Sequence, residues 1–104
     1  MQETELKGKT ISEMCAICHG IAKEKGFWDQ ERNIGEALML VVTELAEAME
    51  GHRIKDTANF KEEIADAFIR LFDLCGGLGI DIEEEIVRKS IKNKSRPYKH
   101  GKIC

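Results

Sequence analysis

Four helix-start signals divide this chain of 104 residues and restrict what it can fold into. Each signal is a Thr, Asn or Asp followed three positions later by Glu, and the pairs are Thr10–Glu13, Asn33–Glu36, Asn59–Glu62 and Asp81–Glu84. The first side chain of such a pair accepts a hydrogen bond from a free backbone N–H of the first helical turn. The signals predict helices from Thr10 to about Gly26, from Asn33 to near Gly51, from Asn59 to the glycines Gly76, Gly77 and Gly79, and from Asp81 to a point before Pro97. We therefore expect an all-α fold.

The expected second and third helices carry apolar residues over much of their circumference. The apolar positions of the second are Ile34, Leu38, Val41, Val42, Leu45 and Met49. The third has one apolar face of Phe60, Ile64, Ala67, Phe68, Leu71, Leu74, Cys75 and Leu78, and another of Ala65, Ile69 and Phe72. Helices that are apolar so widely are buried from more than one direction. Four short helices of one chain do not easily provide such burial, so we expect a four-helix bundle completed by homo-oligomerisation.

The composition fits a single soluble domain over residues 1–104. Hydrophobic residues make up 42% of the chain and charged residues 34%, which supplies a modest core and a polar surface. The net charge of −3 argues against binding to a nucleic-acid polymer. No apolar run approaches the ~20 residues that span a bilayer, and the N-terminal MQETELKGK has no hydrophobic signal core. We therefore expect a cytoplasmic protein with no membrane partner and with its cysteines as thiols.

Two acidic pairs give the clearest indication of chemistry. Glu44 and Glu47 lie in the expected second helix, and Glu63 and Asp66 lie in the third. A spacing of three places both members of a pair on one helix face, where like charges repel. A divalent cation would convert this repulsion into binding, and carboxylate oxygens are the ligands that Mg²⁺ and Mn²⁺ prefer. The pattern indicates a metal site of the kind that serves phosphate chemistry.

The acidic pairs have two other interpretations. Surface helices rich in Glu are common, so the pairs could lie on a solvated helix face. Di-iron helical bundles use carboxylates together with a Glu-x-x-His motif, and no Glu of this chain has His three residues later. The all-carboxylate set favours Mg²⁺, with Mn²⁺ as a possible substitute.

The segment CAICH, residues 15–19, matches the C-x-x-C-H pattern of haem attachment. Covalent haem attachment requires export, for which the N-terminus offers no signal. Cys15 and Cys18 also share the apolar side of the expected first helix with Ile11 and Met14, so we expect them to be buried as small hydrophobic residues. Cys75 and Cys104 lack the paired spacing of zinc ligands.

The C-terminal part of the chain is its one basic region. From residue 88 to residue 102 it carries Arg88, Lys89, Lys92, Lys94, Arg96, Lys99, His100 and Lys102. Arg96 offers a planar fork for phosphate, and the neighbouring Pro97 fixes the chain locally. Phe27 and Trp28 lie in an expected loop; Phe27 is best read as a core residue, whereas Trp28 could either fill the core or stack on a base.

Taken together, these residues resemble the MazG-like, all-α nucleoside triphosphate pyrophosphohydrolases. That family has E-x-x-E on one helix and E-x-x-D on the next, here Glu44-Leu-Ala-Glu47 and Glu63-Ile-Ala-Asp66. The segment KEKGFWD and the tail NKSRPYKHGK are also similar to the family, and the likeness covers roughly residues 20–102. The resemblance implies hydrolysis of a nucleoside triphosphate, commonly a deoxynucleotide, to the monophosphate and pyrophosphate. It also implies a bundle completed as a homodimer or a dimer-built homotetramer.

The resemblance also implies roles for individual residues. The metal ligands would be Glu44, Glu47, Glu63 and Asp66 for Mg²⁺ or Mn²⁺. Glu47 or Glu50 would orient or deprotonate the attacking water. The expected substrate-binding residues are Trp28 for the base, Lys92, Arg96 and Lys99 for the triphosphate, Asn93 and Tyr98 for sugar or phosphate, and Arg70, which could instead orient the carboxylates. The alternative from another class is a non-enzymatic helical interaction module that uses the same amphipathic helices to bind a partner.

Overall fold

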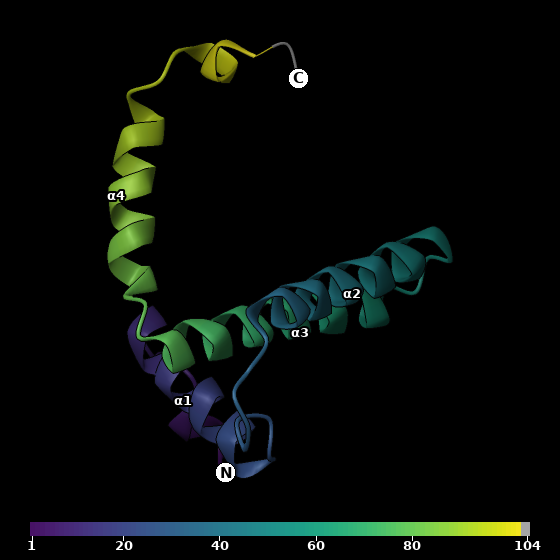
Figure 1. Cartoon of the computed structure of the whole chain (residues 1–104). Coiled ribbons are helices and arrows are strands. Elements are labelled where there is room, and N and C mark those ends of the chain that lie inside the picture. The colour runs from purple at the N-terminus through teal and green to yellow at the C-terminus, as the bar shows by residue number, and fades with distance from the viewer. Residues whose placement is uncertain (103–104) are drawn as a thin grey trace.

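The computed structural model describes residues 1–102 and, in that part of the chain, contains four α-helices and no β-strand (Figure 1). The helices are α1 (Ile11–Glu24), α2 (Ile34–Arg53), α3 (Thr57–Leu78) and α4 (Ile82–Lys94). Two short 3₁₀ helices, η1 (Glu3–Glu5) and η2 (Tyr98–Gly101), flank them. The expected all-α class is therefore confirmed. Cys104 lies outside the described residues.

Three of the four expected helix starts are confirmed. The Thr10 side chain accepts from the backbone N–H of Glu13, and the Glu13 carboxylate accepts from the backbone N–H of Thr10 at 2.8 Å. Asn33 caps α2 and Asp81 caps α4 through side chains that accept from the backbone N–H groups of Glu36 and Glu84. Local capping chemistry therefore fixes where these three helices begin.

The expected start of α3 was wrong by one turn. Asp56 is the N-cap, and its side chain accepts a 3.1 Å hydrogen bond from the backbone N–H of Asn59, which lies inside the helix. Both Asp and Asn can cap a helix, and here the side chain of the earlier residue, Asp56, takes this role. The helix continues through Gly76 and Gly77 and ends at Leu78, because Gly79 takes the left-handed conformation (φ 68°) that closes a helix C-terminus.

The C-terminal ends of α1 and α2 differ from expectation by two residues each. The first helix ends at Glu24 rather than Gly26, and α2 continues past Gly51 to Arg53. The last helix stops at Lys94, before Pro97 as expected.

Helices α2 and α3 form an antiparallel hairpin, and α1 packs across the C-terminal half of α3 (Figure 1). The buried apolar residues at these contacts are small or medium in size: Cys15, Cys18, Ala37, Val41, Ala48, Ala67, Leu74 and Cys75. Cys15 and Cys18 are thus buried as expected. Burial raises the pKa of the Cys15, Cys18 and Cys75 thiols, which keeps them protonated near neutral pH.

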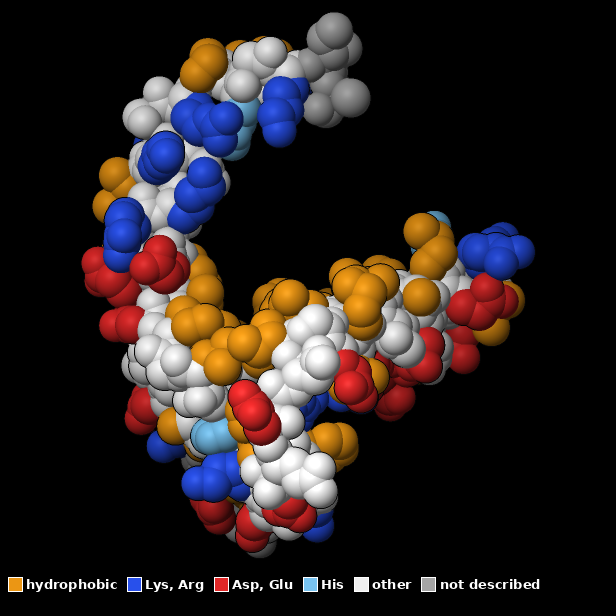
Figure 2. Space-filling view, viewed as in Figure 1, with side chains coloured by type: hydrophobic (Ala, Val, Ile, Leu, Met, Phe, Trp, Pro, Cys, Tyr) orange, Lys and Arg blue, Asp and Glu red, His pale blue; other side chains and the backbone are white. Residues whose placement is uncertain are grey.

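Helix α4 extends away from the α2–α3 hairpin, so the molecule has the outline of an open C (Figure 1). Its principal tertiary contact is with α1, where the backbone N–H of Ser12 donates to Glu83 Oε1 at 3.2 Å. Figure 2 shows hydrophobic side chains along one edge of the α2–α3 arm, acidic side chains along the opposite edge, and Lys and Arg side chains on α4.

The exposed side of α2 carries an apolar stripe at helical spacing. The stripe consists of Ile34, Leu38, Val42, Leu45 and Met49, each between 44% and 58% exposed. On α3, Phe68 is 55% exposed and Leu71 is 38% exposed. Such a contiguous apolar surface is typical of a protein–protein interface.

No helix within residues 1–102 combines the length and the apolar character needed to span a bilayer.

Candidate metal centre

Three carboxylates from α2 and α3 meet on one side of the hairpin. One oxygen of each of Glu44, Glu63 and Asp66 lies within 4.8 Å of the other two. The two helices run antiparallel side by side, and the i, i+3 spacing of Glu63 and Asp66 turns both toward Glu44. Two oxygens on opposite sides of a Mg²⁺ ion lie about 4.2 Å apart, so small side-chain movements would bring the three into one coordination sphere.

Glu44 is the anchor of this cluster. It is only 7% exposed, and its Oε1 accepts a 3.0 Å hydrogen bond from Nε of Arg70. Burial alone would raise the pKa of Glu44, but hydrogen bonds to Glu63 and Arg70, together with the charge of Arg70, hold that pKa below its ordinary value. Glu44 is therefore ionised and held in place near neutral pH.

Glu63 has the opposite electrostatic character. The close carboxylates of Glu44 and Glu47, with which Glu63 can share a proton only in its protonated form, together with partial burial and repulsion by both neighbours, raise its pKa to about 7. Its Oε2 is buried and has no hydrogen-bond partner among residues 1–102. A carboxylate facing two others can be satisfied only by a shared proton or by a cation. The arrangement thus fits a divalent metal, because the ion would give Glu63 Oε2 the positively charged partner that it lacks.

The other two acidic residues singled out in the sequence occupy different positions. Glu47 is exposed and close enough to Glu63 to raise its pKa, so it borders the cluster. Glu50, one turn further along α2, forms a 3.0 Å ion pair with Arg53 and is also exposed.

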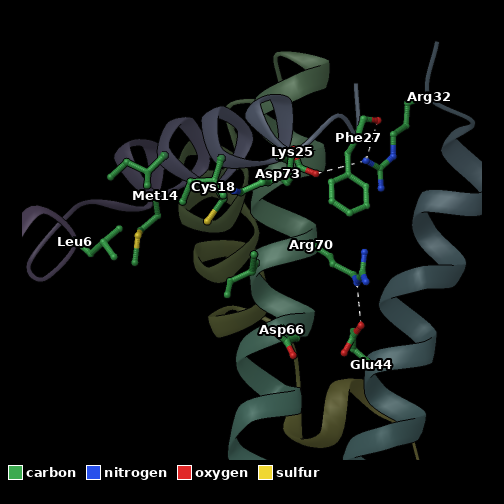
Figure 3. A pocket seen from close by; sticks show the side chains of 14 residues that line it. Leu6, Met14, Cys18, Lys25, Phe27, Arg32, Glu44, Asp66, Arg70 and Asp73 are labelled. Atoms are coloured by element: carbon green, nitrogen blue, oxygen red, sulfur yellow. Dashed lines mark hydrogen bonds and ion pairs between the residues drawn. The ribbon is translucent and has the colours of Figure 1, made fainter. Parts of the chain in front are cut away.

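A cavity of about 470 Å³ lies beside the carboxylates, between α1, α2 and α3 (Figure 3). Its apolar wall is formed by Leu6, Met14, Ile17, Cys18, Ile21, Ala22, Phe27 and Ile69. Glu44 and Asp66 lie at one end in Figure 3, Phe27 and Arg32 at the other, and Arg70 between them. An apolar cavity of this volume with a few convergent charged groups has the character of a small-molecule site.

Asp73 organises the far end of the cavity. It is 7% exposed, and its Oδ1 accepts from Trp28 Nε1 at 2.8 Å and lies 3.1 Å from His19 Nδ1. Its Oδ2 lies 3.7 Å from NH1 of Arg32. Sequence reasoning did not select Asp73, His19 or Arg32. The signal that could have found them is the close spacing of Trp28 and Arg32 in one loop, together with a lone Asp among the apolar residues of α3.

Trp28 fills space between helices and is not among the residues that line the cavity. Its ring meets His19 edge-on at 4.8 Å, and it lies so close to Gly77 that a Cβ there would overlap it. The neighbouring Phe27 lines the cavity instead and is 54% exposed. Phe27, expected to be a core residue, is therefore the aromatic side chain that lines the cavity.

The basic residues expected at the triphosphate are not brought to the carboxylates within one chain. Lys92 lies on α4, Arg96 lies between α4 and η2, and Tyr98 and Lys99 lie in η2. Tyr98 is 89% exposed, and the Lys99 ammonium sits 5.9 Å from its ring centroid. Asn93 lies on α4, and its Oδ1 is buried without a hydrogen-bond partner among residues 1–102.

None of the protein-family descriptions, curated proteins or solved structures compared with this chain matches it. What the geometry itself defines is an all-α protein with a carboxylate cluster, suited to a divalent cation, beside an apolar cavity.

Proposed function

We propose that the chain is a MazG-like nucleoside triphosphate pyrophosphohydrolase, which converts a nucleoside triphosphate to the monophosphate and pyrophosphate. The observation that carries the proposal is the Glu63 oxygen that lacks a hydrogen-bond partner beside Glu44 and Asp66. A half-buried carboxylate whose pKa is raised by neighbouring carboxylates, beside a cavity, is characteristic of a functional site. The adjacent cavity supports a ligand with a large apolar part and an anionic end.

In this proposal Glu44, Glu63 and Asp66 hold Mg²⁺, with Glu47 as a fourth ligand or as the base for the water. Mg²⁺ held by these residues would neutralise phosphate charge and make a nearby water easier to deprotonate. The water oxygen bonds to one phosphorus of the α–β linkage, the bond from that phosphorus to the bridging oxygen breaks, and Glu47 accepts the proton. Arg70 keeps Glu44 ionised and oriented, as a positioning residue.

We further propose that a second copy of the chain completes the site. The apolar stripe of α2 and the exposed Phe68 and Leu71 of α3 would be covered by a partner in a homodimer or dimer-built tetramer. The basic residues of α4 and η2 do not reach the carboxylates of their own chain, so Lys92, Arg96 and Lys99 would approach the triphosphate bound by the partner. Their positive charge complements the acidic edge of the α2–α3 arm (Figure 2).

The same exposed apolar surface is the observation that favours the second candidate, a non-enzymatic interaction module. The two candidates differ in their response to ligand. A ligand that binds only the native state must raise the melting temperature. Mg²⁺ together with a nucleotide should therefore stabilise the enzyme and leave the module unchanged.

The decisive experiment separates products by anion-exchange chromatography after incubation with deoxynucleoside triphosphates and Mg²⁺. The proposal requires nucleoside monophosphate and pyrophosphate in equal amounts, and no activity after chelation. Glu63→Gln should lower the rate at least about a hundredfold. Glu62→Gln alters the exposed neighbouring residue and serves as the matched control, with near-normal turnover expected. Release of orthophosphate alone, or equal rates for both variants, would contradict the proposal.

A further inference from the structure

Arg32 is held at the end of the cavity away from the carboxylates. Its side chain is 12% exposed, and its NH1 donates to the Phe27 carbonyl at 3.4 Å and lies 3.7 Å from Asp73 Oδ2. The guanidinium carbon lies 5.6 Å from the ring centroid of Phe27 and 5.3 Å from that of Trp28. Four contacts thus fix a side chain that would otherwise be mobile, and Figure 3 shows its guanidinium turned toward Asp73 above the Phe27 ring.

At this end of the cavity, Arg32 offers hydrogen-bond donors to a ligand. Both interactions of Arg32 with oxygen use NH1, and guanidinium carries five N–H groups in a planar fork with no acceptor. Asp73, the acidic neighbour, is already engaged: Oδ1 faces Trp28 and His19, and Oδ2 faces Arg32. A ligand group that reaches this end therefore meets free donors and an apolar ring.

These donors discriminate among nucleobases. Two parallel N–H groups pair best with two adjacent acceptors, as in the bidentate contact of Arg with O6 and N7 of guanine. Cytosine also presents adjacent acceptors, O2 and N3. In adenine, the acceptors N1 and N7 each lie next to the N6 amino group, which is a donor. In thymine, the acceptors O2 and O4 each lie next to the N3–H donor. Adenine and thymine would leave one N–H of the fork facing a donor.

We infer that Arg32, positioned by Asp73, selects a base with two adjacent acceptors, so that guanine and cytosine nucleotides are preferred over adenine and thymine nucleotides. This inference rests on the proposed function, because it assumes that the phosphates lie at the Glu44 and Asp66 end of the cavity. The base then extends past Arg70 to stack near Phe27, with its acceptor edge on Arg32.

The test compares kcat/KM for dGTP, dCTP, dATP and dTTP in the wild type, in Arg32→Lys and in Arg88→Lys. A bidentate contact discriminates by about tenfold or more, so dGTP or dCTP should exceed dATP by at least that factor in the wild type. Arg32→Lys keeps the positive charge but loses the planar pair of N–H donors. The ratio of kcat/KM for dGTP or dCTP to that for dATP should therefore fall to within about threefold. Arg88 is exposed and ion-paired with Glu85, so Arg88→Lys should leave the ratio unchanged.

A binding measurement provides a readout without turnover. Trp28 is the only tryptophan of the chain, so its fluorescence reports on the Arg32 end of the cavity. In the presence of Mg²⁺, dGMP or dCMP should bind the wild type about tenfold more tightly than dAMP, and Arg32→Lys should remove this difference.

Each outcome decides between the two claims. Hydrolysis of all four nucleotides at similar rates overturns the base selection and leaves the proposed function standing. A loss in Arg32→Lys that is equal for all four nucleotides shows that Arg32 only supports the loop, which also overturns the inference. Absence of hydrolysis by the folded wild type overturns the proposed function and the inference together.

Discussion

Nε of Arg70 on α3 donates a 3.0 Å hydrogen bond to Oε1 of Glu44 on α2, and this contact joins the two helices beside the carboxylate cluster. The Glu44 side chain is 10% exposed, whereas that of Arg70 is 31% exposed. Glu44 therefore depends on Arg70 for the compensation of a nearly buried charge. The same carboxylate also contributes an oxygen to the cluster with Glu63 and Asp66.

Removal of this arginine tests how the buried charge is supported. Arg70→Met should lower the free energy of unfolding by about 1–2 kcal/mol in the absence of metal, because Glu44 would remain buried without its donor. Mg²⁺ should restore more stability to this variant than to the wild type, since the cation replaces the lost positive charge. Urea denaturation with and without Mg²⁺ measures both effects. The control Arg53→Met, which breaks the exposed pair with Glu50, should cost less than about 0.5 kcal/mol.

The raised pKa of Glu63 predicts how the stability of the metal-free protein depends on pH. The folded state retains a proton up to a pKa of about 7, whereas the unfolded chain releases it near 4.5. Between these values the native state binds more protons than the unfolded state, so stability falls as pH rises from about 5 through about 7. Thermal melts at a series of pH values in a chelating buffer should show this decline in the wild type and in Glu62→Gln. Glu63→Gln should not show it, and an equal decline in all three proteins would locate the titration elsewhere.

Replacement by alanine should change the free energy of unfolding in opposite directions at two helical glycines, Gly77 and Gly20. At Gly77 of α3 a Cβ would overlap the Trp28 ring, whereas at Gly20 of α1 a Cβ would have nothing within 4 Å. Gly77→Ala should therefore lower the free energy of unfolding by about 1–3 kcal/mol or more through overpacking. Gly20→Ala should raise it by about 0.5–1 kcal/mol, because alanine is the better helix former. Chemical denaturation monitored by far-UV circular dichroism distinguishes the two, and equal effects would show that Trp28 does not pack on α3 as described.

The parts of this molecule that follow from local chemistry were accessible from the sequence. The caps at Thr10, Asn33 and Asp81 depend on residues three positions apart, and the meeting of Glu44 with Asp66 follows from helical spacing in a short hairpin. The start of α3, which the sequence placed one turn too late, does not follow from local chemistry alone. Both Asp56 and Asn59 have side chains that could cap α3, and the structure uses Asp56.

The positions of the cavity residues depend on long-range contacts. Asp73 gains its partners from α1 and from the loop after it, 54 and 45 positions away, and no periodicity in the sequence encodes this pairing. For the same reason the sequence could not show that Phe27, and not Trp28, lines the cavity. The direction of α4 also could not be anticipated, because few of its residues pack against the rest of the chain.

The apolar stripe predicts the state of association. Multi-angle light scattering at micromolar concentration should give at least a dimer of the 11.8 kDa chain. Leu45→Glu places a charge in the middle of the stripe and should shift the protein toward the monomer. Thr43→Glu adds the same charge to the polar side of α2 and should leave the mass unchanged. A wild-type monomer at all concentrations would contradict the proposed homo-oligomer.

The central claim is that Glu44, Glu63 and Asp66 hold a divalent cation, and titration with Mn²⁺ followed by electron paramagnetic resonance tests it most directly. Free Mn²⁺ gives a sharp six-line spectrum that broadens on binding, so the bound fraction is measured without any assumption about substrate. The wild type and Glu62→Gln should bind Mn²⁺ in a fixed stoichiometric amount that Mg²⁺ displaces. In Glu63→Gln this binding should be at least about tenfold weaker, because one charged ligand is lost. Equal binding by Glu63→Gln and the wild type, or no binding by the folded wild type at millimolar Mn²⁺, would contradict the account.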